Sequence, residues 1–147
     1  MDTITLSFTR DLEYLRLATV VSSEICTKLI ADQKISENFK RDLELVICEA
    51  AANAIKHGGE SGGRNFAMLT FEIGDSSLKI NVRDQGKGFD IGEIPEPDFD
   101  SVPEGGYGIY IMRTIMDDVS YNTGDDGWNT LTLIKNYDVT SELVVTT

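Results

Sequence analysis

The chain has 147 residues, 41% of them hydrophobic and 26% charged, so it is long enough to bury the core of one ordinary soluble domain. Its formal net charge of −12 argues against a nucleic-acid phosphate surface, which needs clustered lysine and arginine. No stretch approaches the roughly 20 apolar residues of a membrane helix, and the first ten residues lack the pattern of a signal peptide. We therefore expect a single cytoplasmic domain, residues 1–147, that contacts neither nucleic acid nor membrane.

Cysteine and histidine content argues against a zinc site or a disulfide. Cys26 and Cys48 both lie in apolar, helix-like sequence, and the chain has one histidine. Two such cysteines are typical of buried free thiols in a reducing compartment.

The first third of the chain predicts a strand followed by a helix. Residues 3–9 alternate between apolar and hydroxyl side chains, which is the period of a half-buried strand. A helix is expected over residues 11–32, with a break at 33–38 in which Ser36 is positioned as the N-cap of the next helix. The inward face of the first helix is predicted to carry Leu12, Leu15, Ala18, Ile25 and Leu29.

The stretch from Leu43 to Gly58 predicts a buried helix that carries polar groups along one edge. Apolar residues recur at intervals of three and four, while Glu49 and Asn53 fall together on another face, because residues four apart on a helix are neighbours. The helix is expected to end at Gly58-Gly59, before a glycine- and serine-rich loop at 60–64. The apolar stripe comprises Leu43, Val46, Ile47, Ala50 and Ala54.

The rest of the chain predicts two hairpins separated by a loop and a short helix. Residues 65–73 and 78–83 favour one hairpin, and residues 119–122 and 128–135 favour another. Between them, residues 84–106 lack any periodicity, which is typical of a functional or mobile loop, and a helix follows from Gly108. This order of elements predicts a two-layer α/β sandwich with a mixed, mostly antiparallel sheet covered by about three helices.

Three short patterns are candidates for chemistry. Glu49 and Asn53 point into the same space, and a glutamate among alanine, valine and isoleucine is costly to bury without a partner or a task. Asp84 opens a D-x-G-x-G pattern after a predicted strand, where a carboxylate can accept a hydrogen bond from an exocyclic amine. Residues 105–108, Gly-Gly-Tyr-Gly, open a helix whose free N–H groups suit a phosphate.

Each pattern alone also has a purely structural interpretation. The first fits a solvated edge of an amphipathic helix, the second a glycine turn capped by an aspartate, and the third a flexible linker. Together and in this order, the three resemble the N, G1 and G2 boxes of the GHKL ATPase superfamily. Within that superfamily the segments CEAAANAIKHG, VRDQGKGFD and GGYGIYIMRTIMDDVSY are most similar to serine-kinase anti-sigma factors of the RsbW and SpoIIAB type.

The resemblance implies ATP and Mg²⁺ as cofactors and assigns roles to individual residues. Asn53 is implied to hold the Mg²⁺, and Glu49 to act as the general base toward the attacking hydroxyl. Asp84 is implied to bind the adenine amino group, with Thr130 nearby through a water-linked contact. The glycines implied in the adenine pocket, the lid hinge and the phosphate turn are Gly86, Gly88, Gly105, Gly106 and Gly108.

Three further residues keep more than one interpretation. His57 shares the face of Asn53 and fits either a phosphate contact or an interaction with the last helix carbonyls. Arg113 fits either a phosphate contact or an exposed position. Glu104 departs from the basic or small residue that relatives carry just before the glycines.

The function implied is that of an Mg-ATP-dependent protein-serine kinase and anti-sigma regulator. Such a protein phosphorylates a small antagonist of the STAS type, sequesters a sigma factor or similar partner, and forms a homodimer. One alternative is an interaction module that binds ATP without transferring phosphate. Another is the ATPase domain of a histidine kinase, which needs a phosphoacceptor histidine, whereas the only histidine here is His57.

Overall fold

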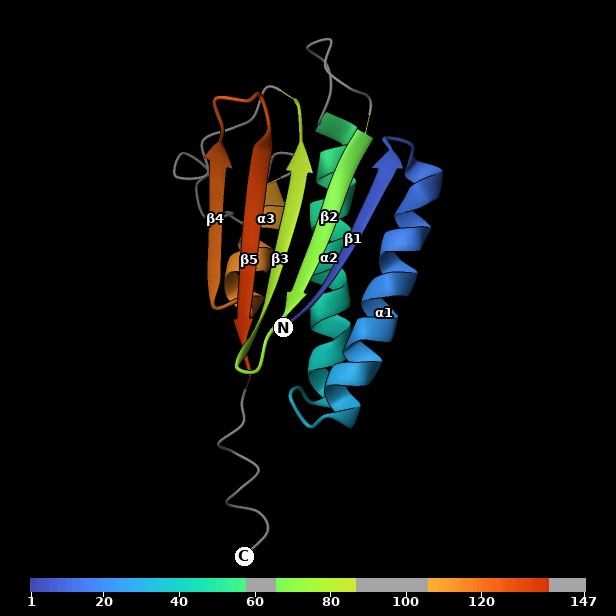
Figure 1. Cartoon of the computed structure of the whole chain (residues 1–147), viewed down its shortest axis with the longest axis vertical. Helices are drawn as coiled ribbons and strands as arrows, with labels where there is room; N and C mark the ends of the chain where they lie inside the picture. Colours follow the sequence, from blue (N-terminus) through green and yellow to red (C-terminus); the bar gives the residue numbers. More distant parts are fainter. Residues whose placement is uncertain (58–65, 87–105, 138–147) are drawn as a thin grey trace, which may run out of the picture.

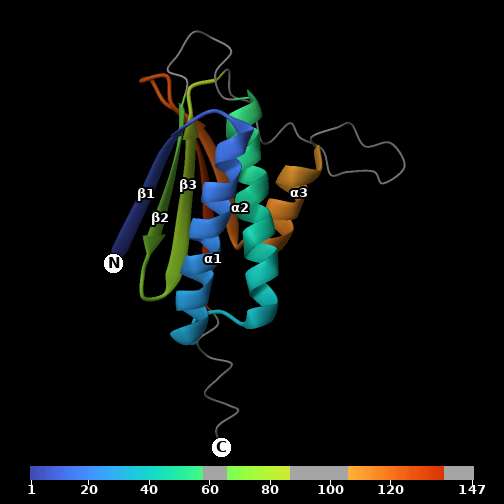
Figure 2. The ribbon, with the colours of Figure 1, turned by 90° about the vertical axis from the view of Figure 1, so that its right-hand side faces the viewer.

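The computed structural model describes residues 1–57, 66–86 and 106–137 and forms two layers, a five-stranded sheet and a layer of helices on one of its faces (Figures 1 and 2). No helix in these ranges is long and apolar enough to cross a membrane. The elements are β1 (Asp2–Thr9), the 3-10 turn η1 (Leu12–Tyr14), α1 (Leu15–Ala31), α2 (Glu37–His57), β2 (Phe66–Ile73), β3 (Ser77–Asp84), α3 (Gly106–Ile115), β4 (Asp118–Thr123) and β5 (Asn129–Asn136).

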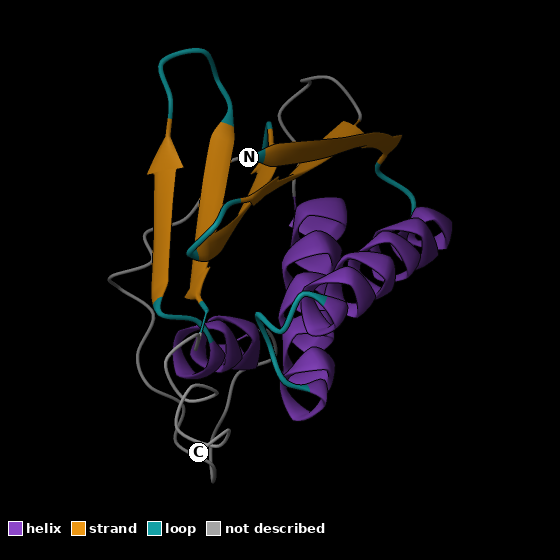
Figure 3. Ribbon diagram, turned by 60° about the horizontal axis from the view of Figure 1, so that its bottom comes forward, coloured by secondary structure: helices purple, strands orange, loops and turns teal. Residues whose placement is uncertain are grey.

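The strand order is β1-β2-β3-β5-β4, and every pair among the described strands is antiparallel. The two-layer α/β sandwich and both hairpins are thus confirmed, while the expectation of a mixed sheet is corrected. After β3 the chain passes through α3, and the last hairpin returns with β5 next to β3 and β4 at the edge. Figure 3 shows α3 under the β4 and β5 side of the sheet, with the other two helices under the β1 and β2 side.

The predicted stripe of α2 forms the centre of the helix layer. All five of its apolar members are buried, and α2 contacts both α1 and α3. Ser36 caps this helix as predicted, since its hydroxyl accepts a hydrogen bond from the Phe39 N–H at 3.2 Å. At the other end the Arg10 guanidinium donates to the Ile55 carbonyl at 2.8 Å, which satisfies a carbonyl in the last turn. The predicted end at Gly58-Gly59 lies outside the described residues.

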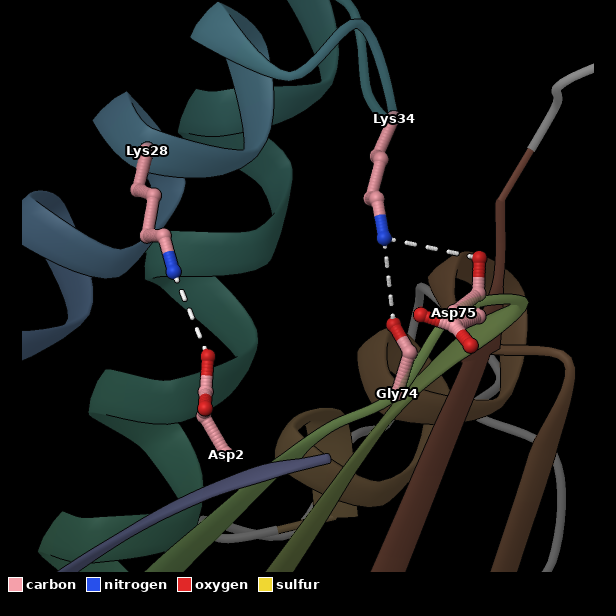
Figure 4. A network of polar contacts seen from close by, with 5 residues as sticks. All are labelled: Asp2, Lys28, Lys34, Gly74 and Asp75. Atoms are coloured by element: carbon pink, nitrogen blue, oxygen red, sulfur yellow. Dashed lines mark hydrogen bonds and ion pairs between the residues drawn. The ribbon is translucent and has the colours of Figure 1, made fainter.

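One predicted core position in the first helix is wrong. Leu12 is 53% exposed, because residues 12–14 form a 3-10 turn capped by Asp11 and the α-helix starts only at Leu15. Figure 4 shows two lysines that contact the sheet, Lys28 in the last turn of α1 and Lys34 just after the end of this helix. The Lys28 ammonium lies 3.3 Å from the Asp2 carboxylate, and Lys34 donates to the Gly74 carbonyl at 3.3 Å. An ion pair and a hydrogen bond therefore link the helix layer to the sheet at the end where β1 begins.

Strand alternation decides which side chains face the helices. In β2 and β3 every second residue is buried in the core, and the residues between them lie on the uncovered face. Asp84, at the end of β3, continues the inward series of Leu78, Ile80 and Val82. This parity places the Asp84 carboxylate on the helix side of the sheet.

Both cysteines are free thiols, as the sequence predicts, and Cys26 is fully buried. Burial, and then the nearby Glu44 carboxylate, raise the pKa of the Cys26 thiol from 9.0 to about 11. Burial raises the pKa of Cys48 as well. At neutral pH both side chains are therefore neutral.

We expect the Cys26 thiol of the folded chain to resist alkylation. A rise of the pKa from 9.0 to about 11 lowers the thiolate fraction near pH 8 by about 100-fold, and the thiolate is the nucleophile. The measurement is iodoacetamide labelling at pH 8, with the Cys26 peptide quantified by mass spectrometry in native buffer and in guanidinium chloride. Equal labelling rates in the two buffers would contradict this expectation.

Candidate functional site

The first half of the candidate site lies on α2. Glu49 and Asn53 are both half-buried and lie one turn apart on the edge of the helix next to the apolar stripe. Their neighbours Ala50 and Ala54 are buried and fix the rotation of the helix. The carboxylate and the carboxamide are therefore presented together, as the four-residue spacing predicts.

The structure brings Gly108 of α3 against this pair. A methyl carbon at Gly108 would lie 3.3 Å from Oε2 of Glu49 and 3.4 Å from Nδ2 of Asn53. The first distance is tighter than ordinary van der Waals contact and the second is at its lower limit, so the missing side chain lets α3 approach α2 at this point. Glu49 and Asn53 of the first sequence pattern thus lie close to Gly108 of the third.

The second half of the candidate site lies at the sheet. Oδ1 of Asp84 accepts hydrogen bonds from the Gly86 N–H and from Nδ2 of Asn129, each at 2.9 Å. The same Nδ2 donates to the Gly86 carbonyl at 2.9 Å. Asp84, the turn after it and the first residue of β5 therefore form one small polar cluster.

Asn129, and not Thr130, is the β5 residue that meets Asp84. Asn129 is the register partner of Asp84, whereas Thr130 is opposite Arg83. Arg83 lies on the uncovered face, where its guanidinium stacks over the Trp128 ring at 4.9 Å from the ring centroid. Successive residues of a strand point to opposite faces, so the structure does not bring Thr130 into this cluster.

A signal in the sequence could have identified Asn129. In β5 the inward positions are Asn129, Leu131 and Leu133, so the asparagine is a polar residue in an apolar series. Within a strand such a break in the alternation marks a site that needs a hydrogen bond.

Several predicted residues fall partly or wholly outside the described part of the chain. Gly88, Gly105 and Glu104 lie outside it. Gly106 is the first residue of α3, so the predicted helix is present but begins two residues before the expected start at Gly108. His57 is the last residue of α2, and Arg113 is exposed in the last turn of α3.

The donor set at α2 suits a magnesium ion that is held mainly by phosphate. Within the described ranges, no group of three or more histidine, cysteine, aspartate or glutamate side chains is placed to hold a metal ion. Glu49 and Asn53 supply oxygen donors side by side, and Mg²⁺ usually takes one or two protein oxygens together with substrate phosphates and water. These residues therefore fit Mg²⁺ that arrives with a nucleotide.

The two halves of the site differ in chemistry. The α2 half offers a carboxylate and a carboxamide close to the start of α3, where free N–H groups and the helix dipole favour a negative charge. The sheet half offers a carboxylate held in place by two donors. One half suits phosphates and a metal ion, and the other suits a group that donates a hydrogen bond.

Comparisons with known proteins identify the family of the chain. The family model of the histidine kinase-like ATPase domain matches residues 8–135. Serine-protein kinase RsbW of Bacillus licheniformis is 31% identical over 115 residues, which cover 73% of this chain and 69% of the relative. Anti-sigma F factor of the same species is 32% identical over 99 residues, which cover 65% and 68%.

A solved structure shows the same fold. A chain in the SiaB-SiaC complex from Pseudomonas aeruginosa superimposes with a TM-score of 0.57 at 12% identity, over 90% of this chain and 89% of that chain. The family match covers both halves of the site, from Glu49 to Asn129. The chain therefore belongs to the histidine kinase-like ATPase domain family, as a relative of the RsbW serine-protein kinases and anti-sigma F factors.

Proposed function

We propose that this protein is an Mg-ATP-dependent protein-serine kinase that also acts as an anti-sigma-type regulator. The observation that carries the proposal is the close approach of Gly108 of α3 to the Glu49 and Asn53 side chains of α2. It supports a site in which a general base and a metal-binding amide lie beside the terminal phosphate of a nucleotide bound at the start of α3. The names of the relatives, serine-protein kinase and anti-sigma factor, agree with it.

The proposal assigns a role to each residue of the candidate site that the structure describes. Asn53 holds the Mg²⁺, which neutralises phosphate charge when it is bound, and Glu49 accepts the proton of the attacking serine hydroxyl. The first N–H groups of α3, from Gly106, receive phosphate oxygens. Asp84 accepts a hydrogen bond from the base. Phosphoryl transfer depends on positioning and charge neutralisation, so these groups suffice in a chain whose net charge is −12.

The proposed partners are a phosphorylated antagonist and a sequestered regulator, as the resemblance of the sequence motifs implies, and the relatives named as a serine-protein kinase and an anti-sigma factor support them. We place the phosphoacceptor serine on a small antagonist of the STAS type. When the protein is free of this antagonist, it sequesters a sigma factor or a similar regulator. The active unit is a homodimer in the cytoplasm, where ATP is available. A ligand-dependent choice between two partners requires that each prefers a different state of the nucleotide site.

A capture experiment tests this proposal directly. The purified chain is immobilised and offered a cell lysate with ADP, with ATP and Mg²⁺, or without nucleotide, and the captured proteins are mapped for phosphoserine. We expect a small captured protein that gains one phosphoserine only with ATP and Mg²⁺. Uptake of nucleotide without any phosphoserine would favour the interaction module, and an acid-labile phosphohistidine would favour a histidine kinase.

We expect Asp84→Asn to weaken ADP binding by roughly 10-fold to 100-fold, the usual cost of a hydrogen bond to a charged group. The asparagine oxygen can keep the two hydrogen bonds from Gly86 and Asn129, so its new amino group takes the place of Oδ2 and repels the amine of the base. Titration calorimetry with ADP and Mg²⁺ measures the effect. Asp118→Asn on the exposed edge of β4 is the matched control, and equal affinities of the two variants would refute the role of Asp84.

A further inference from the structure

Asn129 is a buried amide with a one-sided set of hydrogen bonds. Its side chain is 1% exposed at the start of β5. Nδ2 donates to Oδ1 of Asp84 and to the Gly86 carbonyl, each at 2.9 Å. Oδ1 of Asn129 is buried and has no donor among the described residues.

These contacts determine the orientation of the amide. Both atoms that face Nδ2 are acceptors, namely a carboxylate oxygen and a carbonyl oxygen. A flipped amide would place Oδ1 against these two acceptors and lose both hydrogen bonds. The donor side of Asn129 therefore faces Asp84.

The effect on Asp84 is to occupy one of its two oxygens. A carboxylate oxygen has two lone pairs, and Oδ1 receives one hydrogen bond from the Gly86 N–H and one from Asn129. Oδ2 receives no hydrogen bond from the described residues and is the oxygen left to meet a ligand. Asp84 therefore presents one open carboxylate oxygen to a ligand, and not both oxygens.

Purine bases differ in the number of donors that they present to a carboxylate. Adenine offers its exocyclic amine beside the N1 acceptor, which one carboxylate oxygen can satisfy. Guanine offers two adjacent donors, N1–H and the 2-amino group, which match a carboxylate with both oxygens open. A site with one open oxygen leaves a guanine donor unpaired, and an unpaired buried donor is costly.

We propose that Asn129 is a specificity-determining residue that makes the nucleotide site select adenine over guanine by occupying Oδ1 of Asp84. The inference rests on the proposed nucleotide function and adds to it a residue and a reason for the base preference. Asn129 acts through Asp84, so it is a positioning residue.

A purely structural role explains Asn129 poorly. The next inward positions of β5 are Leu131 and Leu133, and an apolar residue at 129 would continue that series. The amide instead leaves its own buried oxygen without a partner in the part of the chain that the structure describes, and a buried polar atom without a hydrogen bond reduces stability. Residues that break the local pattern at such a cost are typical of functional sites.

The test is the ratio of the dissociation constants of GDP and ADP, each measured with Mg²⁺ by titration calorimetry. For the wild-type chain we expect ADP to bind on the order of 100-fold more tightly than GDP. Asn129→Ala frees one lone pair of Oδ1 of Asp84, while the Gly86 N–H keeps the other, and should narrow the ratio by about tenfold, mainly through tighter GDP binding. Asn129→Val, which continues the apolar series, should do the same while keeping more of the buried volume and the fold.

The control and the contrary outcomes are specific. Asn81→Ala removes an amide on the uncovered face of β3, where Oδ1 of Asn81 accepts from the Thr132 hydroxyl, and should leave the ratio unchanged. A wild-type chain that binds ADP and GDP equally, or Asn129 variants with an unchanged ratio, would overturn this inference alone. A folded wild-type chain that binds neither nucleotide would overturn the proposed function and this inference with it.

Discussion

Glu49→Gln is expected to reduce phosphotransfer by about 10²-fold to 10⁴-fold, the usual contribution of a general base, while ADP binding with Mg²⁺ persists. Glutamine has nearly the same shape, so the contact with Gly108 and the packing of α2 are kept. It cannot accept the serine proton. Binding and transfer should therefore separate in this variant more clearly than in any other.

The measurement is single-turnover transfer of labelled phosphate from ATP to the captured antagonist, with calorimetry of ADP binding alongside. Glu37→Gln, in the exposed first turn of the same helix, is the matched control and should keep the wild-type rate. A Glu49→Gln variant that transfers phosphate at the control rate would remove Glu49 from the mechanism. A wild-type chain that binds ADP and transfers phosphate to no captured protein would favour the interaction module.

Gly108→Val is expected to abolish nucleotide binding and to lower the free energy of unfolding by about 1–3 kcal/mol, the usual cost of overpacking. The β-carbon alone would lie 3.3 Å from Oε2 of Glu49, and the two valine methyl groups need still more room. Either α3 moves away from α2 or the Glu49 and Asn53 side chains leave their positions. Both changes destroy the arrangement that the proposed site requires.

Two companion variants identify the cause of the loss. Gly108→Ala should be milder, because Glu49 and Asn53 meet the new methyl group with the ends of flexible side chains. Thr114→Val changes an exposed position of the same helix, where the hydroxyl only donates to the Tyr110 carbonyl, and should bind ADP normally. Thermal unfolding and ADP calorimetry measure both quantities, and normal binding by Gly108→Val would show that the contact is dispensable.

Local patterns in the sequence predict most of the fold. Alternating or strand-like runs between turn signals locate all five described strands, and the three-and-four spacing of Leu43 to Ala54 locates the helix that organises the core. Ser36 and Gly108 mark helix starts to within two residues, because capping and glycine preferences are local properties. The exposed Leu12 was missed because a short 3-10 turn has no distinct apolar period.

The strand order is a different kind of information. The insertion of β5 between β3 and β4 depends on contacts between residues far apart in the chain, which local periodicity does not contain. The direction of the β3 and β5 pair, which are not neighbours in sequence, is likewise a non-local property. For this reason the two-layer architecture was predictable, while the all-antiparallel sheet was not.

The site shows how far helix and strand patterns can be used. Glu49 and Asn53 could be paired from spacing alone, since a helix brings every fourth residue together. In β5 a difference of one residue changes the face, so choosing Thr130 over Asn129 exchanged an outward residue for the inward one. Only the register of β3 against β5 decides between them.

The alanines of α2 have a consequence for the nucleotide itself. Ala50, Ala51 and Ala54 are all buried, and such small side chains allow this helix to lie close to its neighbours in the core. Glu49 and Asn53 belong to α2, whereas Asp84 and Asn129 belong to the sheet. The separation between this helix and the sheet therefore sets the distance between the groups that would bind the two ends of a nucleotide. Enlarging one of these alanines by a single carbon would move α2 relative to the sheet. The length of the ligand that fits would then change, although no residue that contacts the ligand would be altered.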